Sequence, residues 1–298
     1  MNTFRPSKLQ EVIGQKTTKE CLQILINSAK KQEKSLPHIL FNGPAGTGKT
    51  TLAYIIAKEF GVDIQITNGG NFRSLKHLLP VLSKITPFSI LFIDEIHRIA
   101  PAVEEILYPV MEDFQITLTW EKSSFNLDLG KFTLIGATTD SGSLSKPLLD
   151  RFGVKLSLTT YSINELADLL VHNSPKLGLK LHYEAAAFIA KCSKGTPRIA
   201  NHLLSWIGDY CFSKGHTFIN VPVAMSALQM LQIDNKGFTL NDRKYLQVLK
   251  NAKFPLGIHT LCSLTNLSKD TIENQIEPFL LRQGLIVKTL KGRIICST

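Results

Sequence analysis

The sequence lacks a signal peptide, a membrane-spanning segment and the cysteine pairs of a structural zinc site. None of its apolar runs approaches the roughly 18 to 20 residues that cross a bilayer, and the start MNTFRPSKLQ has no apolar signal-peptide core. The five cysteines are odd in number and widely spaced, without the close pairs typical of zinc sites. We therefore expect a cytoplasmic protein with no membrane-spanning segment, whose thiols stay reduced: Cys21, Cys192, Cys211, Cys262 and Cys296.

Low-complexity tracts are also missing, and acidic residues are outnumbered. With 44% hydrophobic and 19% charged residues, the chain is typical of a folded protein, and its 298 residues exceed what one hydrophobic core holds efficiently. Two or three domains are therefore expected. The 34 Lys and Arg against 24 Asp and Glu give a formal charge of +10, which favours a polyanionic partner. Charge alone leaves nucleic acid and an anionic membrane both open.

A glycine-rich loop follows a short apolar run at residues 39–42. Residues 43–50 read GPAGTGKT, which satisfies the phosphate-loop spacing GxxxxGK[ST], and a helical pattern starts directly afterwards. Glycines let backbone N–H groups close around phosphate oxygens at the helix N-terminus. We expect Lys49 to reach the β- and γ-phosphates and Thr50 to bind Mg²⁺, within a nucleotide-contacting set of Gly46, Thr47, Gly48, Lys49, Thr50 and Thr51. A glycine turn before an ordinary helix is the alternative, but it does not account for the complete motif.

Two carboxylates follow a second apolar run. Residues 89–95 have the composition of a buried parallel strand, and Asp94 and Glu95 stand at its carboxyl end, where such sheets bind ligands. Asp94 is suited to hold hydrated Mg²⁺, and Glu95 to orient or deprotonate an attacking water. Taken alone, the pattern also fits a strand that merely ends in acidic residues. A further apolar strand at 132–139 ends in Thr139, which could touch the γ-phosphate or the water, although threonine is common at strand ends.

Several further segments are specific in combination. They read FRP at 4–6, IGQ at 13–15, DEIHR at 94–98, EEILYP at 104–109, IGATT at 135–139, DRFG at 150–153 and GTPRIAN at 195–201. Phosphate-loop motifs mark a very large superfamily, whereas this combination resembles the RuvB family of AAA+ motors, which drive branch migration of Holliday junctions. The resemblance covers nearly the whole chain. It implies an α/β fold, with a parallel-sheet AAA+ ATPase domain, a helical lid and a C-terminal winged helix, and ATP with Mg²⁺ as cofactors.

The resemblance also implies roles that spacing does not reveal. Arg151 matches the arginine finger that reaches the ATP of a neighbouring subunit, whereas the residues alone suggest a surface ion pair with Asp150. Arg198 matches the sensor arginine of the lid. Further nucleotide contacts are implied at Phe4, Arg5, Tyr161 and Pro197 within one subunit, and across the subunit boundary at Glu112, Asp113 and Phe114.

Three features depart from the family pattern. Ala45 and Thr47 stand where the family has Pro and Leu, which is tolerable because the backbone makes the phosphate contacts. Asp140 stands where the family has Arg, which reverses a charge near the subunit boundary. The third is the segment 115–129, which alternates like a β-hairpin around a turn at 121–124 but is several residues shorter than the family hairpin that docks onto the junction-binding protein RuvA. In that hairpin Trp120 is a candidate anchor for the partner, with packing on its own domain as the alternative.

The remaining segments divide the chain further. Residues 1–157 form the expected AAA+ domain, and residues 158–233 form the lid, because apolar residues recur at helical spacing throughout 164–231. Residues 232–237 have the composition of a linker. Such a lid covers the nucleotide and swings when the γ-phosphate is lost.

Residues 234–298 are expected to form a winged helix. The pattern predicts helices at 240–251, at 258–264 and after Ser268, then a two-stranded wing at 285–288 and 293–296. Residues 236–298 carry ten Lys or Arg against four Asp or Glu, an excess of six positive charges. A protein-binding winged helix is the alternative, but the cations favour DNA, with phosphate contacts expected at Lys269, Lys288, Lys291 and Arg293.

These observations predict an ATP-hydrolysing ring, expected to be a hexamer, that moves duplex DNA and Holliday junctions in recombination and repair. Contacts to phosphates would make its grip largely independent of sequence. Two other classes share part of the pattern. A clamp-loader or initiator type of AAA+ switch has the same nucleotide motifs, and a non-catalytic DNA-binding regulator would lack the hydrolytic residues, all of which are present: Lys49, Asp94, Glu95 and Arg151.

Overall fold

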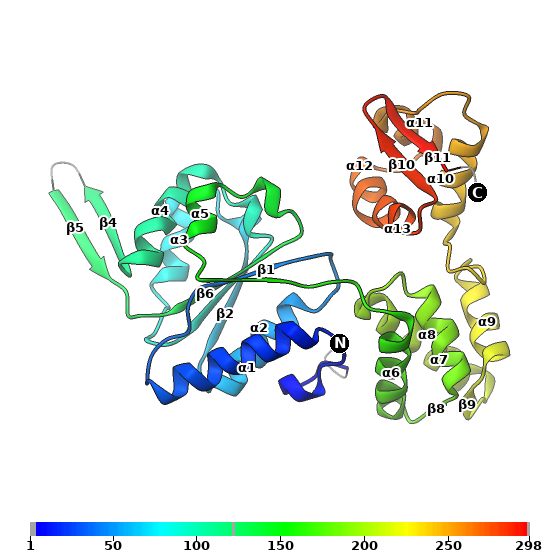
Figure 1. Cartoon of the computed structure of the whole chain (residues 1–298), viewed down its shortest axis with the longest axis horizontal. Coiled ribbons are helices and arrows are strands. Elements are labelled where there is room, and N and C mark those ends of the chain that lie inside the picture. The colour runs from blue at the N-terminus through cyan, green and yellow to red at the C-terminus, as the bar shows by residue number, and fades with distance from the viewer. Residues whose placement is uncertain (1–3, 121–122, 297–298) are drawn as a thin grey trace. The chain divides into compact units, whose positions relative to one another are not determined.

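The chain divides into two compact units (Figure 1). The computed structural model describes residues 4–120 and 123–296, with the backbone alone for 117–120 and 123–125. The first unit is Met1–Glu165 together with Thr196–Arg198, and the second is Leu166–Gly195 together with Ile199–Thr298. The lid and winged-helix segments thus share one unit. The division into three domains, with boundaries at 157/158 and 233/234, stays a prediction.

A parallel sheet of five strands forms the centre of the first unit. Its order across the sheet is β2 (Ile64–Asn68), β3 (Ile90–Asp94), β6 (Thr133–Thr138), β1 (Ile39–Asn42) and β7 (Val154–Ser157). The three central strands are almost wholly buried and apolar, as parallel strands covered on both faces must be. The strands predicted at 39–42, 89–95 and 132–139 are confirmed to within one residue at each end.

Helices cover both faces of this sheet (Figure 1). Neighbouring residues of a strand point to opposite faces, so Leu134 and Ile135 of β6 belong to two different cores. Ile135 packs with α1 (Lys16–Lys31) and α2 (Lys49–Phe60), and Leu134 packs with α3 (Leu75–Leu82), α4 (Pro101–Glu112) and α5 (Lys146–Asp150). The two apolar layers fix the strands, so the loops at their carboxyl ends start from rigid positions.

The predicted hairpin is present and extends away from the sheet (Figure 1). β4 (Gln115–Trp120) pairs with β5 (Ser123–Asp128), from Gln115↔Asp128 to Trp120↔Ser123. The four-residue turn predicted at 121–124 is wrong, because Ser123 and Ser124 are already paired in β5. Residues 121–122 and the side chain of Trp120 lie outside the described part of the chain, so the anchor role of Trp120 stays a prediction.

The lid segment consists of four α-helices and two short strands. The helices are α6 (Ile163–Asn173), α7 (Tyr183–Cys192), α8 (Pro197–Lys214) and α9 (Val221–Met230). The prediction of helix throughout 164–231 is wrong where β8 (Lys180–Leu181) pairs in parallel with β9 (Phe218–Ile219). Gly178 and Gly215, both at φ 71°, precede these strands, and glycine in the left-handed region commonly ends a helix.

The winged helix is confirmed. Its helices and wing are α10 (Leu240–Asn251), α11 (Ile258–Thr265), α12 (Lys269–Thr271), α13 (Glu277–Arg282), β10 (Ile286–Thr289) and β11 (Gly292–Ile295). Tyr245, Leu261 and Ile286 pack in its core. The third predicted helix is interrupted by a π-helical turn at Ile272–Ile276, directly before Pro278, which has no N–H for the regular helix ladder.

The last two features are the possible membrane spans and the cysteines. Within residues 4–120 and 123–296, no helix is both long enough and apolar enough to cross a membrane. All five cysteines lie among the described residues, and none of them forms a disulfide there.

Candidate functional site

The phosphate loop lies between β1 and α2. Gly43, Gly46 and Gly48 have φ values of 146°, 80° and 109°, a region where side chains are strained, so the loop needs glycine at these positions. Lys49 begins α2, and its Nζ donates to the carbonyl oxygens of Gly43 at 2.6 Å and Pro44 at 3.0 Å. The ammonium group is therefore folded into the loop, where we expect the phosphates.

Asp94 and Glu95 lie beside this loop, because β3, β6 and β1 are neighbours whose carboxyl ends meet at one edge. Burial raises the pKa of Asp94, the Glu95 carboxylate raises it further, and Lys49 and Arg198 act in the opposite direction. Burial lowers the pKa of Lys49, and both carboxylates oppose that change. The structure thus brings together four of the predicted catalytic groups within one electrostatic environment.

Glu95 is held by two neighbours. The Thr139 hydroxyl donates to Glu95 Oε2 at 3.0 Å, and His97 Nδ1 lies 3.3 Å from the same oxygen and 2.9 Å from the Thr138 hydroxyl. An ionised carboxylate only accepts hydrogen bonds, so this geometry favours the tautomer with a proton on Nδ1. His97 received no role from the sequence. Its position has a local cause. Glu95 adopts φ 47°, and the turn Ile96–Arg98 that follows brings the His97 imidazole next to the Glu95 carboxylate.

Two predicted residues from beyond the sheet also meet the loop. The Tyr161 hydroxyl donates to the carbonyl of Thr47 at 3.3 Å, and the Arg198 backbone N–H donates to the carbonyl of Gly46 at 3.4 Å. A Cβ on Gly46 would lie 3.1 Å from the Arg198 Cβ. Burial raises the pKa of Tyr161 to about 12, so it remains a neutral donor. The loop is therefore covered by Tyr161 and by Arg198, at the start of α8, whereas the nucleotide contact of Pro197 stays a prediction.

Gln15, which had no predicted role, binds the backbone two residues before Tyr161. Its side-chain amide donates to the Thr159 carbonyl at 2.7 Å and accepts from the Thr159 N–H at 3.3 Å. A Cβ on the neighbouring Gly14 would lie 2.9 Å from the Tyr161 ring. The segment IGQ therefore packs beside the tyrosine, and no periodic pattern could reveal this pairing of residues 144 positions apart.

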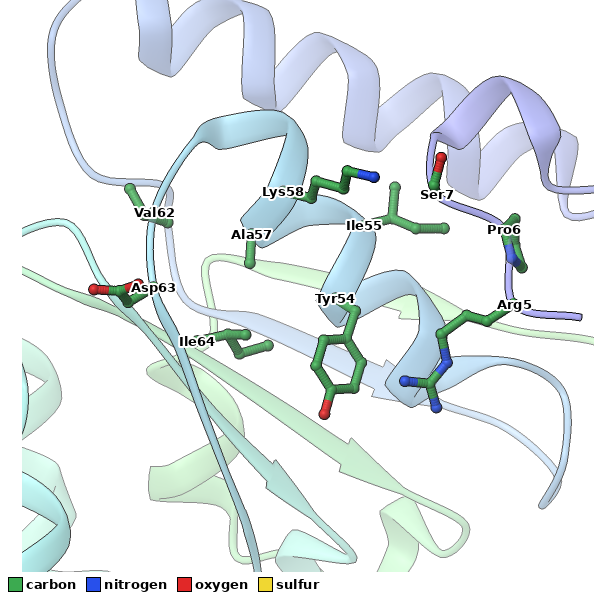
Figure 2. Close-up of a pocket in the computed structure, with 10 residues that line it drawn as sticks. All are labelled: Arg5, Pro6, Ser7, Tyr54, Ile55, Ala57, Lys58, Val62, Asp63 and Ile64. Carbon is green, nitrogen blue, oxygen red and sulfur yellow. The ribbon is translucent and has the colours of Figure 1, made fainter. Parts of the chain in front are cut away.

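Arg5 is placed at a different hollow, with a volume of about 550 Å³ (Figure 2). Its guanidinium lies over the Tyr54 ring, 4.6 Å from the centroid, and the hollow continues past Lys58 to Asp63. Of the described residues that line this hollow, none belongs to the phosphate loop. The nucleotide contacts of Arg5 and of its partly buried neighbour Phe4 stay predictions.

Arg151 is held at the end of α5 by its own subunit. Its Nη2 pairs with Glu112 Oε2 at 3.1 Å, its Nη1 donates to the Pro147 carbonyl at 2.8 Å, and its guanidinium lies 4.2 Å from the centroid of the Tyr108 ring. The alternative ion pair with Asp150 is thus replaced by one with Glu112. Stacking and pairing orient the guanidinium without burying it completely, since 19% of the side chain is exposed.

The other cross-subunit candidates follow α4. Phe114, at φ 56°, packs its ring against His38 and Phe132, with centroids 6.0 and 5.8 Å away. Phe114 therefore serves the core of its own subunit, whereas its neighbour Asp113 is exposed. His38 is buried, accepts from the Leu134 N–H at Nδ1, and is neutral because burial lowers its pKa.

Asp140, the departure from the family pattern, is bound within its own loop. It accepts a hydrogen bond from Ser143, and its backbone N–H donates to the Thr138 hydroxyl at 3.0 Å. The bond from Ser143 lowers the pKa of Asp140, against a smaller effect of burial and with help from His97. The residue is an exposed anion two positions beyond Thr138, and its effect on a neighbouring subunit stays a prediction.

The candidate DNA contacts lie on the winged helix: Lys269, Lys288, Lys291 and Arg293. Lys288 and Arg293 face each other across the wing, and both pair with Glu277, at 2.6 and 2.8 Å. Arg293 also pairs with Glu273 at 3.1 Å, and Lys269 lies 3.9 Å from Glu273. Three of the four cations, Lys269, Lys288 and Arg293, therefore lie around two carboxylates that the sequence did not connect with them, and the DNA contacts of all four stay predictions.

Similarity to known proteins extends over nearly the whole chain. Residues 4–158 match the family described as the Holliday junction DNA helicase RuvB P-loop domain, residues 161–234 match the RuvB AAA lid domain, and residues 235–298 match the RuvB C-terminal winged helix domain. The chain is 42% identical, over 299 aligned positions, to the Holliday junction branch migration complex subunit RuvB of Granulibacter bethesdensis, and the match covers 98% of this chain and 83% of that protein.

Solved structures agree with this match. The Thermotoga maritima RuvB Holliday junction branch migration motor is similar with a TM-score of 0.90 and 37% identity, covering 99% of this chain and 96% of that one. A mutant of Thermotoga maritima RuvB is similar with a TM-score of 0.91 and 37% identity, covering 98% and 96%. The fold, the arrangement at the phosphate loop and these matches agree, and the chain belongs to the RuvB family.

Proposed function

We propose that this protein is an ATP-driven motor that moves duplex DNA during branch migration of Holliday junctions, in recombination and repair. The observation that carries the proposal is the hydrolytic arrangement at the carboxyl edge of the sheet, where Lys49, Asp94 and Glu95 share one environment and Thr139 binds Glu95. Relatives of 42% and 37% identity are named as RuvB branch migration proteins, which supports the DNA-directed part of the proposal.

Each residue of the site has a distinct part in hydrolysis. Lys49 and the loop N–H groups bind the β- and γ-phosphates, and Arg198 offsets charge on the γ-phosphate from within the same subunit. Glu95 orients the attacking water and accepts its proton. Thr139 holds the Glu95 carboxylate in the direction from which it meets that water.

Thr50 and Asp94 fit the Mg²⁺ that this chemistry uses. They offer a hydroxyl and a carboxylate oxygen, and oxygen donors are what Mg²⁺ prefers in combination with substrate phosphates. The carboxyl group of Asp94 has a pKa raised by burial and by Glu95, so a cation at that position would favour its ionised form. When bound, Mg²⁺ supplies positive charge against the phosphate oxygens.

A second subunit completes the proposed site. Arg151 is oriented by Tyr108 and Glu112 at the surface of its own subunit, which suits a finger that stabilises the transition state in a neighbour. This motivates a closed ring, and we propose a hexamer that acts in the cytoplasm. The hairpin 115–129 extends from the sheet and is the proposed contact for a RuvA-like junction-binding protein.

An assay on a synthetic Holliday junction tests the motor. We expect ATP-dependent strand exchange that increases when a RuvA-type partner is added, and no exchange by Lys49→Ala, which removes the phosphate-binding ammonium group. A loader-type switch would hydrolyse ATP without displacing strands. Absence of exchange with an active ATPase, with and without the partner, would therefore refute the motor function and favour the loader class.

A further inference from the structure

Two carboxylates gather the cations of the wing, and they differ in burial. Glu277 is completely buried and accepts from Arg293 Nε at 2.8 Å, Lys288 Nζ at 2.6 Å and the Tyr245 hydroxyl at 2.8 Å. Glu273 is 32% exposed and binds Arg293 Nη2 at 3.1 Å. One acid is thus part of the core, whereas solvent reaches the other.

Glu277 fixes the direction of the Arg293 side chain. Burial raises the pKa of Glu277, but hydrogen bonds from Arg293, Lys288 and Tyr245 outweigh that effect, so the pKa is lowered overall. Arg293 is also held by its backbone, which pairs with Leu256 through bonds of 2.8 and 3.0 Å. The Nε side of the guanidinium is therefore anchored, and its Nη2 side is directed at Glu273.

Glu273 occupies the cations that are proposed to bind DNA. A carboxylate and a phosphate diester both carry one negative charge and accept the same N–H donors of arginine. Glu273 holds Arg293 and also lies 3.9 Å from Lys269, which is 60% exposed. A DNA phosphate that approaches these two cations must therefore compete with this carboxylate.

We propose that Glu273 is an intramolecular competitor of the DNA backbone, which holds Arg293 and Lys269 while DNA is absent and yields them to a phosphate when duplex DNA binds. Glu277 keeps the guanidinium anchored in both states. A motor must release each register before it grips the next, and a competing carboxylate lowers the cost of release. The inference rests on the proposed DNA contact of the winged helix.

The test is salt-dependent DNA binding by the full chain. Fluorescence anisotropy with a labelled duplex and a slowly hydrolysed ATP analogue would compare the wild type with Glu273→Gln between 50 and 200 mM salt. An ion pair of this exposure is worth up to about 1 kcal/mol, so we expect Kd to fall about 2- to 5-fold. The plot of log K against log salt should steepen by up to about one, since the wild-type carboxylate, once displaced by DNA, takes up a counterion that a glutamine does not.

Asp270→Asn is the matched control. Asp270 lies in α12, three residues before Glu273, is exposed, and accepts a hydrogen bond from Asn274 at 2.8 Å. Both variants remove one negative charge from the same segment, so a change of net charge acts equally on both. The expected result is that Glu273→Gln binds DNA more tightly than Asp270→Asn, with thermal unfolding close to that of the wild type.

Two results would overturn the inference, and they are distinguishable. If Glu273→Gln binds no more tightly than Asp270→Asn while the wild type binds DNA normally, Glu273 does not compete and only helps to position Arg293. If the wild type itself binds no duplex at any salt concentration, the proposed DNA-directed function fails, and this inference fails with it.

Discussion

Glu95 is the residue on which the chemistry of the site depends most. Thr139 and His97 both face Oε2, so we expect Oε1 to receive the proton of the attacking water. The carboxylate is thus positioned by strand β6 and by the turn that follows β3. These two contacts fix the direction of the base, as preorganised catalysis requires.

Replacing Glu95 by Gln should separate binding from hydrolysis. Because Gln keeps the size of the side chain but cannot accept a proton, we expect steady-state ATPase to fall by roughly 10²- to 10⁴-fold. Binding of a fluorescent ATP analogue should persist. Glu105→Gln, an exposed site on α4, is the control and should leave turnover unchanged. Unchanged turnover in Glu95→Gln would remove Glu95 from its role.

Glu277 gives the winged helix a dependence on pH. Its pKa in the folded protein is lowered below the ordinary 4.5, so its contribution to stability is present above about pH 4.5 and is lost as pH falls through the lowered value. Glu277→Gln leaves Arg293 and Lys288 without their buried anion and should cost about 3 kcal/mol at pH 7. Urea unfolding at pH 7 and pH 3.5 checks this, and a difference between the two proteins that does not shrink at acid pH would contradict it.

At the scale of elements, the segment between the lid and the winged helix is a packed connection. Gly237 has φ 84°, and a Cβ there would lie 2.8 Å from the Cys192 Cα at the end of α7. The turn is closed by a hydrogen bond from the Gly237 N–H to the Asp234 carbonyl at 2.8 Å. The Lys194 ammonium, just beyond α7, pairs with the buried Asp242 of α10 at 2.5 Å. These contacts join the predicted linker to both segments.

Gly237→Ala should therefore lower the free energy of unfolding by more than the backbone strain of an alanine at positive φ. Gly215→Ala is the matched control, since Gly215 has φ 71° and a Cβ there would meet nothing within 4 Å. We expect a cost of about 1 kcal/mol for Gly215→Ala and about 2 to 3 kcal/mol for Gly237→Ala, because the second adds a collision with backbone. Chemical denaturation of the full chain measures both. Equal losses of stability in the two variants would contradict this, because they would mean that the backbone around Gly237 shifts to accept the added Cβ.

At the scale of the whole molecule, the proposed site needs two subunits. In a mixture of Arg151→Ala and Glu95→Gln proteins, one subunit brings an intact Glu95 and the other an intact Arg151. Each variant alone should be nearly inactive, with roughly a 10³-fold loss for the missing finger. Mixing them should restore a measurable fraction of ATPase activity. If the mixture remains as inactive as its components, Arg151 does not act across a boundary.

Elements and motifs with a local cause could be predicted from the sequence. A complete phosphate loop with a strand before it and a helix after it predicted β1, α2 and Lys49, and apolar runs ending in polar residues predicted β3 and β6 to within one residue. Order and charge also predicted the winged helix. These features follow from periodicity and backbone preference, which neighbouring residues are sufficient to set.

Which distant side chains meet became apparent only in the folded chain. Packing turned His97 onto Glu95, paired Gln15 with Thr159, and placed Arg5 over the ring of Tyr54. It also joined Glu273 and Glu277 to the cations of the wing. The net charge of a segment does not show which of its charges pair. Pairing depends on distances of a few ångströms, and these arise only when helix and wing pack around a common core.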